Sequence, residues 1–143
     1  MEARTCHVRL VDWSASADRL REIRRVVFVE EQRVPEELEI DGHDPACVHV
    51  LAEDAHGEAV GTGRLLPDGR IGRMAVLATW RNRGIGARLL HTLMEAARAQ
   101  GLREIHLHAQ QDARAFYERH GFMIEGEPYL EAGIPHIDMR CTL

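Results

Sequence analysis

Hydrophobic residues alternate with polar ones along several short stretches of the chain, which is the period of a half-buried strand. The stretches with this pattern, bounded by turn-forming residues, are 7–11, 48–52, 59–66, 70–76, 104–109, 122–124 and 136–142. We expect a turn at 54–57 to join two of them as a hairpin and a turn at 67–69 to lead into the next. Residues 127–135 are expected to form a loop.

In other stretches, hydrophobic residues recur every three or four positions, as they do on one face of a helix. The first predicted helix is capped by Ser14 or Ser16 and runs to about Gln32, because Pro35 disfavours helix in the residue before it. Residues 33–46 are acidic and contain helix breakers, so we expect a loop with one short helical turn.

A second helix follows the strand at 70–76 and is expected to end at Gly101, and a short third helix covers about 112–120. The predicted order is strand, helix, hairpin strands, helix, strand, helix, strands. This order excludes a purely alternating, doubly wound α/β fold.

A short basic loop with two glycines joins the strand at 70–76 to the second helix. Its sequence places Arg81 and Arg83 just before Gly84 and Gly86. Backbone N–H groups at a helix N-terminus have no partners within the helix, and the helix dipole favours negative charge there. The loop therefore predicts a phosphate site built mainly from main chain.

Two other phosphate-binding motifs fit this loop poorly. A dinucleotide-binding turn needs an acidic residue about 20 positions further on, where this chain has His106. A P-loop needs Gly-Lys followed by Ser or Thr, and that sequence is missing.

The pattern R-x-x-G-x-G at 81–86 resembles the acyl-CoA pyrophosphate loop of the GNAT superfamily of N-acetyltransferases. A second segment, at 113–122, is similar to that family's A-x-x-F/L-Y-x-x-x-G-F sequence. The resemblance implies a single domain over 1–143 with an α/β (α+β) GNAT fold. That fold is a mixed, mostly antiparallel sheet of about six or seven strands with helices on both faces. Two parallel strands flank the long helix and splay apart around the acyl-CoA.

The resemblance also implies how acetyl-CoA, the acyl donor, is bound. Backbone groups of Met74, Ala75 and Val76 would hydrogen-bond the pantetheine arm, and N–H groups from the loop would hold the pyrophosphate. Most GNATs have an asparagine at the position of Gln110, so that contact departs from the family pattern. The cofactor-binding residues implied are Met74, Ala75, Val76, Arg81, Asn82, Arg83, Gly84, Ile85, Gly86, Ala87, Gln110, Ala113, Phe116 and Tyr117.

Transfer of an acetyl group to an amine requires removal of a proton from the ammonium and protonation of the departing thiolate. Tyr117 matches the family's tyrosine and is the candidate general acid, since a tyrosine has a higher pKa than a thiol. Residues 133–139 resemble the G-x-P-H-x-x-M segment of glyphosate-N-acetyltransferase-like GNATs, in which the histidine is the base. That resemblance makes His136 the candidate base, and Glu31 is the alternative.

Residues 24–44 resemble the small ElaA/YjcF-type bacterial GNATs, in which this segment borders the acceptor pocket. Candidate substrate-binding residues are Arg24, Glu31, Asp41, Asp44 and Arg73. The carboxylates of Glu31, Asp41 and Asp44 would attract a cationic amine. A run of charged residues is also typical of a solvent-exposed loop. The arginine that binds substrate in the glyphosate-type enzymes aligns with Gly72, so their acidic substrate does not carry over.

Length and charge limit the remaining possibilities. The 143 residues carry a formal net charge of −5, which disfavours nucleic-acid binding. Three cysteines without short spacing fit a reducing compartment, and neither a signal-like segment nor an apolar run of membrane-spanning length is present. We therefore expect a cytoplasmic protein without a membrane partner, with a homodimer as an option.

A protein or peptide N-acetyltransferase would differ from a small-molecule N-acetyltransferase only in its acceptor. Two readings from other classes also stay open. A protein that senses acyl-CoA without transfer would share every feature of the loop. A zinc-dependent hydrolytic or cupin-like enzyme would use His106, His108 and His136. Because the phosphate loop would then have no purpose, we expect no metal.

Overall fold

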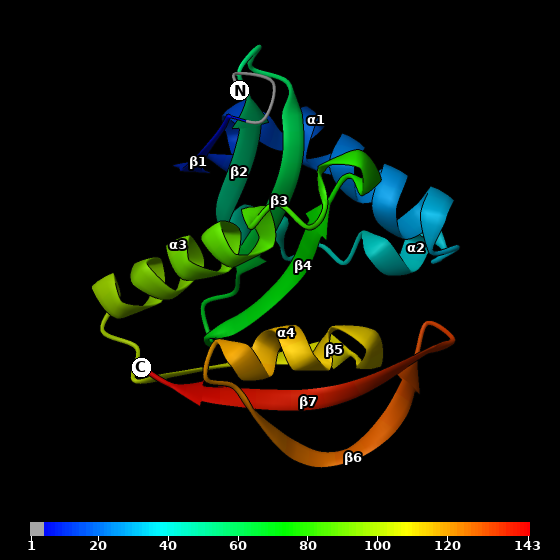
Figure 1. Ribbon diagram of the computed structural model, residues 1–143, viewed down its shortest axis with the longest axis vertical. Coiled ribbons are helices and arrows are strands. Elements are labelled where there is room, and N and C mark those ends of the chain that lie inside the picture. Colours follow the sequence, from blue (N-terminus) through cyan, green and yellow to red (C-terminus); the bar gives the residue numbers. More distant parts are fainter. Residues whose placement is uncertain (1–4) are drawn as a thin grey trace.

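The computed structural model describes residues 5–143, which form one seven-stranded sheet. The strands are β1 (Cys6–Val11), β2 (Val48–Asp54), β3 (Ala59–Leu65), β4 (Arg70–Val76), β5 (Glu104–Gln110), β6 (Met123–Glu131) and β7 (Ile134–Thr142). Their order in the sheet is β1-β2-β3-β4-β5-β7-β6 (Figure 1). Only β4 and β5 pair in parallel within residues 5–143, which confirms the mixed, mostly antiparallel sheet.

Helices cover both faces of this sheet. They are α1 (Trp13–Arg24), α2 (Glu36–Glu39), α3 (Ile85–Ala99) and α4 (Arg114–Arg119), with 3-10 turns at Asp44–Ala46, Ala78–Trp80 and Gln111–Ala113. The predicted first helix does extend to Glu31, but its last part, Arg25–Glu31, is π-helical rather than α-helical. Gly101, at a φ of 82°, follows the end of α3 as predicted.

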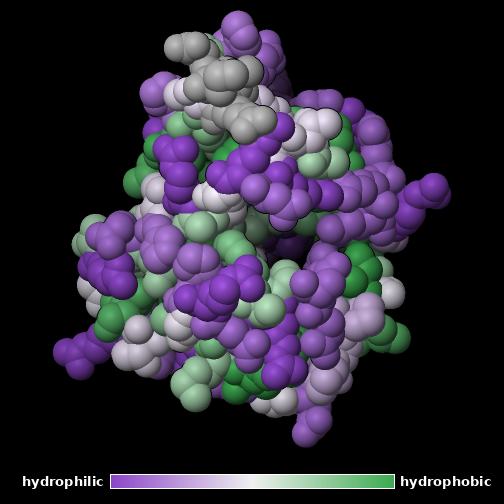
Figure 2. Space-filling view, viewed as in Figure 1, coloured by the Kyte–Doolittle hydropathy of each residue, from purple (hydrophilic) through white to green (hydrophobic). Residues whose placement is uncertain are grey.

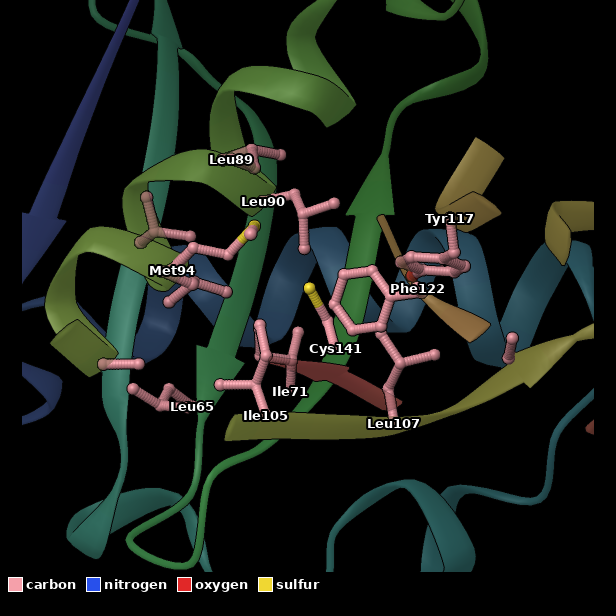
Figure 3. Close-up of a cluster of buried hydrophobic side chains, with 14 of the residues drawn as sticks. Leu65, Ile71, Leu89, Leu90, Met94, Ile105, Leu107, Tyr117, Phe122 and Cys141 are labelled. Carbon is pink, nitrogen blue, oxygen red and sulfur yellow. The ribbon is translucent and has the colours of Figure 1, made fainter. Parts of the chain in front are cut away.

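The hydrophobic core is divided between the two faces because neighbouring strand residues point to opposite sides. Val50 packs in the cluster formed with α3, whereas Leu51 packs in the cluster formed with Leu20 of α1. Figure 3 shows the larger cluster, in which side chains of α3, β4, β5 and β7 meet. Tyr117 of α4 also belongs to this cluster, and Phe122 lies between it and Cys141.

Strands β4 and β5 separate soon after they meet. Their parallel register covers only Arg70 with His106 and Ile71 with Leu107. On its other side β4 contains a bulge opposite β3, where Arg73 has a positive φ of 51°. Residues of β4 beyond the bulge have a partner in β3 but none in β5, so the backbone of β4 is open on one side.

The expectation of a loop at 127–135 is wrong, because β6 and β7 form a hairpin with its turn at Ala132 and Gly133. Both turn residues have positive φ, 52° and 76°, which is the geometry of a tight turn that matches strand twist. Gly126, at a φ of 84°, lies where the pairing register of β6 with β7 shifts. This irregularity interrupts the alternation of hydrophobic and polar residues by which a strand is recognised in the sequence. The hairpin carries Glu131 to the side of His136.

Among residues 5–143, none of the helices has both the length and the apolar character needed to cross a bilayer. Cys6, Cys47 and Cys141 are free thiols. Two of them, Cys6 and Cys141, are buried in the core, where burial raises their pKa.

Candidate active site

Two cavities meet where β4 and β5 separate. The first, here called the loop cavity, has a volume of about 650 Å³ and is lined by the loop before α3 and by α4. The second, the hairpin cavity, has a volume of about 570 Å³ and is lined by the β6–β7 turn and the segment 28–43. Both cavities share the lining residues Gln32, Met74, Gln110, Ala113 and Tyr117. Figure 2 shows a recess on the viewed face, where β4 and α4 stand apart in Figure 1.

The N-terminus of α3 opens into the loop cavity. Gly84 precedes the helix with a left-handed φ of 80°, and the first intrahelical bond runs from the Arg88 N–H to the Gly84 carbonyl at 3.2 Å. Within residues 5–143, no side chain caps this helix and no carbonyl accepts from the N–H groups at 85–87. Asn82, Gly84, Ile85, Gly86 and Ala87 all line the cavity, which suits an anion.

The two loop arginines have other partners. The Arg81 guanidinium donates to the Val76 carbonyl at 2.9 Å and to both carboxylate oxygens of Glu31 at 2.6 and 2.7 Å. Arg83 lies over the Trp80 ring, 4.8 Å from its centroid. Arg81 thus links the end of β4 to the π-helical segment, and the groups at the start of α3 that have no partner within residues 5–143 are backbone N–H groups.

Glu31 does not line either cavity. The hydrogen bond from Arg81 lowers the pKa of its carboxyl, so the group is a weaker base than an ordinary glutamate. The position of Glu31 outside both cavities and its ion pair with Arg81 argue against a role as general base. They indicate that Glu31 instead stabilises the loop.

The open side of β4 presents backbone groups to the loop cavity. The Leu77 N–H donates to the Val60 carbonyl of β3 at 2.9 Å. Because backbone groups alternate in direction along a strand, the Val76 N–H points the other way, toward the gap between β4 and β5. Met74, Ala75 and Val76 all line the cavity.

Tyr117 lies at the junction of the two cavities and is 9% exposed. Its ring makes edge contacts with Phe116 and Phe122, at centroid distances of 5.1 and 5.6 Å. Its hydroxyl makes no hydrogen bond with residues 5–143. Burial raises the pKa of Tyr117 to about 12, so the phenol keeps its proton at neutral pH.

His136 lies in β7 on the wall of the hairpin cavity and is 6% exposed. Its Nδ1–H donates to the Ile134 carbonyl at 2.7 Å. A carbonyl only accepts, so in the neutral ring the other nitrogen, Nε2, carries the lone pair. That Nε2 lies 3.6 Å from Oε2 of Glu131, and the other carboxylate oxygen, Oε1, accepts from His108 Nδ1 at 3.0 Å.

Arg24 and Asp44, two of the candidate substrate-binding residues, line neither cavity. Arg24 is 1% exposed and donates to Asp44 at 2.7 Å and to Glu39 at 2.5 Å. Burial alone would raise the pKa of Asp44, but the hydrogen bonds and charges of Arg24 and Arg64 outweigh it, so the pKa is lowered. The structure therefore gives Arg24 and Asp44 a structural role, contrary to the expectation that they meet substrate.

Asp41 and Arg73 do line the hairpin cavity, but they belong to the same ionic network. Arg73 contacts Asp41 at 3.2 Å and Glu39 at 3.3 Å, and Asp41 also pairs with Arg64. Three arginines thus balance three carboxylates, which leaves little net charge to attract an amine. The network fastens the segment 36–46 to α1, β3 and β4.

Sequence reasoning missed two residues of the junction and the cavity wall. The sequence pattern predicts Gln32 at the end of a helix and Glu131 in a loop, whereas in the structure both line the hairpin cavity. Gln32 has a sequence signal, because it lies in the segment that resembles ElaA/YjcF-type proteins. Glu131 gains its position only from the β6–β7 hairpin.

The histidines do not assemble into a metal centre. Residues 5–143 contain no group of three or more His, Cys, Asp or Glu side chains that could hold a metal ion. His106 lies outside both cavities and is 3.9 Å from Asp68, whereas His108 pairs with Glu131.

A family model described as an acetyltransferase (GNAT) domain matches residues 17–143. The chain belongs to the GNAT family of acetyltransferases. The uncharacterized N-acetyltransferase YjcF of Bacillus subtilis is 38% identical over 121 residues, which are 82% of this chain and 86% of that protein. Both relatives and structural neighbours bear N-acyltransferase names, which supports an enzyme of that class.

Solved GNAT structures share the fold over nearly the whole chain. An acyl-CoA N-acyltransferase from Pseudomonas aeruginosa is 31% identical with a TM-score of 0.85, covering 96% of this chain and 99% of that one. ElaA of Escherichia coli is 29% identical with a TM-score of 0.85 and the same coverage. The family uses acyl-CoA as its donor substrate.

Proposed function

We propose that this GNAT transfers an acetyl group from acetyl-CoA to the primary amine of a small molecule by direct attack in a ternary complex. The donor would lie in the loop cavity, with its pyrophosphate at the N-terminus of α3 and its pantetheine along β4. The acceptor would enter the hairpin cavity. The observation that carries the proposal is that the two cavities meet at Tyr117, with His136 on the acceptor side.

His136 is the proposed general base. Its Nδ1–H is held by the Ile134 carbonyl, so Nε2 is free to take a proton from the incoming ammonium. The nearby Glu131 carboxylate, 3.6 Å from Nε2, would stabilise the imidazolium that results.

The deprotonated amine then attacks the thioester carbonyl. As the carbon–nitrogen bond forms, the Val76 N–H would stabilise the negative charge that develops on the carbonyl oxygen. Collapse of the tetrahedral intermediate breaks the carbon–sulfur bond, and the Tyr117 phenol would protonate the thiolate. The attacking nitrogen releases its second proton as the amide forms, and this proton would restore the phenol. A phenol with a pKa of about 12 is still protonated when the thiolate leaves.

The volume of the hairpin cavity, about 570 Å³, favours a small acceptor, because pockets of roughly 300–1,000 Å³ are typical of small-molecule sites. Apolar side chains such as Phe28, Val34 and Leu38 line one wall, and His108, Glu131 and His136 line another. An amine with an apolar body suits this surface.

A thiol-release assay with acetyl-CoA and a panel of small primary amines tests the proposal. Turnover on an amine, with 1:1 amide product identified by mass spectrometry, would support it. Tight binding of acetyl-CoA without turnover on small amines, peptides or proteins would instead favour an acyl-CoA sensor. Turnover restricted to peptides or proteins would contradict the small-molecule acceptor.

A further inference from the structure

Two glutamine side chains bridge the gap between the π-helical segment and the end of β5. The Gln110 Nε2 donates to the Gln32 Oε1 at 2.7 Å, and the Gln32 Nε2 donates to the Gln110 Oε1 at 3.3 Å. Each amide is thus both donor and acceptor. The two residues are 78 positions apart in the sequence, so only the fold brings them together. Both side chains are half-buried, so the pair replaces bonds that each amide would otherwise make to water.

This amide pair lies at the junction, since both glutamines line both cavities. The other shared lining residues are Met74, Ala113 and Tyr117. Gln110 also pairs across the sheet with His136, the proposed base. A thioester that reaches from the loop cavity toward the acceptor must therefore place its acyl group beside the two amides.

We propose that the Gln32–Gln110 pair limits the length of the acyl chain and selects acetyl over longer aliphatic acyl groups. An acetyl group ends in a single methyl beside the pair. A longer chain would push hydrocarbon against the amides or separate them, and a half-buried amide that loses its partner costs free energy. This inference rests on the proposed function only in placing an acyl-CoA in the loop cavity.

Binding of acetyl-CoA, butyryl-CoA and hexanoyl-CoA, measured by calorimetry without an acceptor, tests the inference separately from turnover. The wild type should bind acetyl-CoA more tightly than the longer donors. In Gln32→Ala and Gln110→Ala, the affinity for butyryl-CoA relative to acetyl-CoA should rise about tenfold, the equivalent of two methylenes entering an apolar site. Gln111→Ala is the matched control, because Gln111 is the neighbouring glutamine and lines neither cavity.

The ratio of affinities separates a length filter from a general role in binding or folding. Equal weakening of all three donors in the Gln32 and Gln110 variants would overturn the inference, as would an unchanged ratio. A wild type that binds hexanoyl-CoA as well as acetyl-CoA would also overturn it while leaving N-acyl transfer intact. A wild type that binds none of the three would overturn the proposed function as well, and only that result would do so.

Discussion

The Nδ1–H of His136 donates to the carbonyl of Ile134, two residues earlier in the same strand, at 2.7 Å. This bond orients the ring and assigns the lone pair of the neutral ring to Nε2, which lies 3.6 Å from Oε2 of Glu131. The strand therefore pre-sets the tautomer that a general base needs.

Replacing this histidine should slow the chemical step and leave donor binding intact. For His136→Ala we expect kcat to fall by about 100-fold or more, within the range typical of a lost general base, with an unchanged Kd for acetyl-CoA. His106→Ala is the control, because His106 lies on the neighbouring strand but outside both cavities. Similar kcat values for the two variants would remove His136 as base.

The hydroxyl of Tyr117 should matter for catalysis more than for stability. In Tyr117→Phe the aromatic contacts remain and no hydrogen bond within residues 5–143 is lost, so Tm should hardly change while kcat falls at least tenfold. In Tyr129→Phe, by contrast, the bond from the hydroxyl to Asp138 is lost and stability should fall by about 1 kcal/mol. Thermal unfolding and thiol release measured on both variants check this contrast; full activity in Tyr117→Phe would contradict the acid role.

Gly86 should be needed for donor binding rather than for folding. A Cβ at this position would lie 3.6 Å from the Phe116 ring, an ordinary contact, so Gly86→Ala should fold normally. Its methyl group would stand at the N-terminus of α3, where the pyrophosphate is expected, and calorimetry should show acetyl-CoA binding weakened by about tenfold. Unchanged affinity with unchanged Tm would place the phosphate elsewhere.

The buried Arg24 should be among the residues most important for stability. Arg24→Met leaves Glu39 and Asp44 buried without their main partner, and we expect a loss of about 3–5 kcal/mol in the free energy of unfolding. Arg98→Met, which removes an exposed pair with Glu95, should change it by less than about 0.5 kcal/mol. Urea denaturation of both variants measures the difference, and equal effects would show that the network contributes little.

The same network predicts acid sensitivity. The folded-state pKa values of Asp41 and Asp44 lie below the ordinary aspartate value, because arginine hydrogen bonds and charges outweigh burial. Their stabilisation is complete above the unfolded pKa of about 3.9 and is lost as the pH falls through that value toward the lower folded values. Urea midpoints between pH 6 and pH 2.5 should therefore decline in the wild type and decline less steeply in Asp44→Asn. Parallel curves would show that Asp44 does not titrate in this way.

The sequence alone determined the local features of this protein. Three such features are the alternation of residues in β4, the glycine-containing loop at 81–86 and the apolar face of α3. Each depends only on neighbours a few positions away, so it can be recognised in the sequence. The two GNAT-like segments, at 81–86 and 113–122, identified the family for the same reason: a phosphate seat and the helix beside it require particular residues at short spacing.

Only the tertiary structure decided which charged side chains are available to bind a substrate and which side chains contact one another. Asp41 and Asp44 look like part of an acidic binding segment in the sequence, but ion pairs with Arg24, Arg64 and Arg73 neutralise them in the fold. The Gln32–Gln110 pair joins residues 78 positions apart, and the β6–β7 hairpin carries Glu131 to His136. Such relationships depend on how strands and helices pack against one another, and burial and ion pairing are properties of that packing rather than of the local sequence.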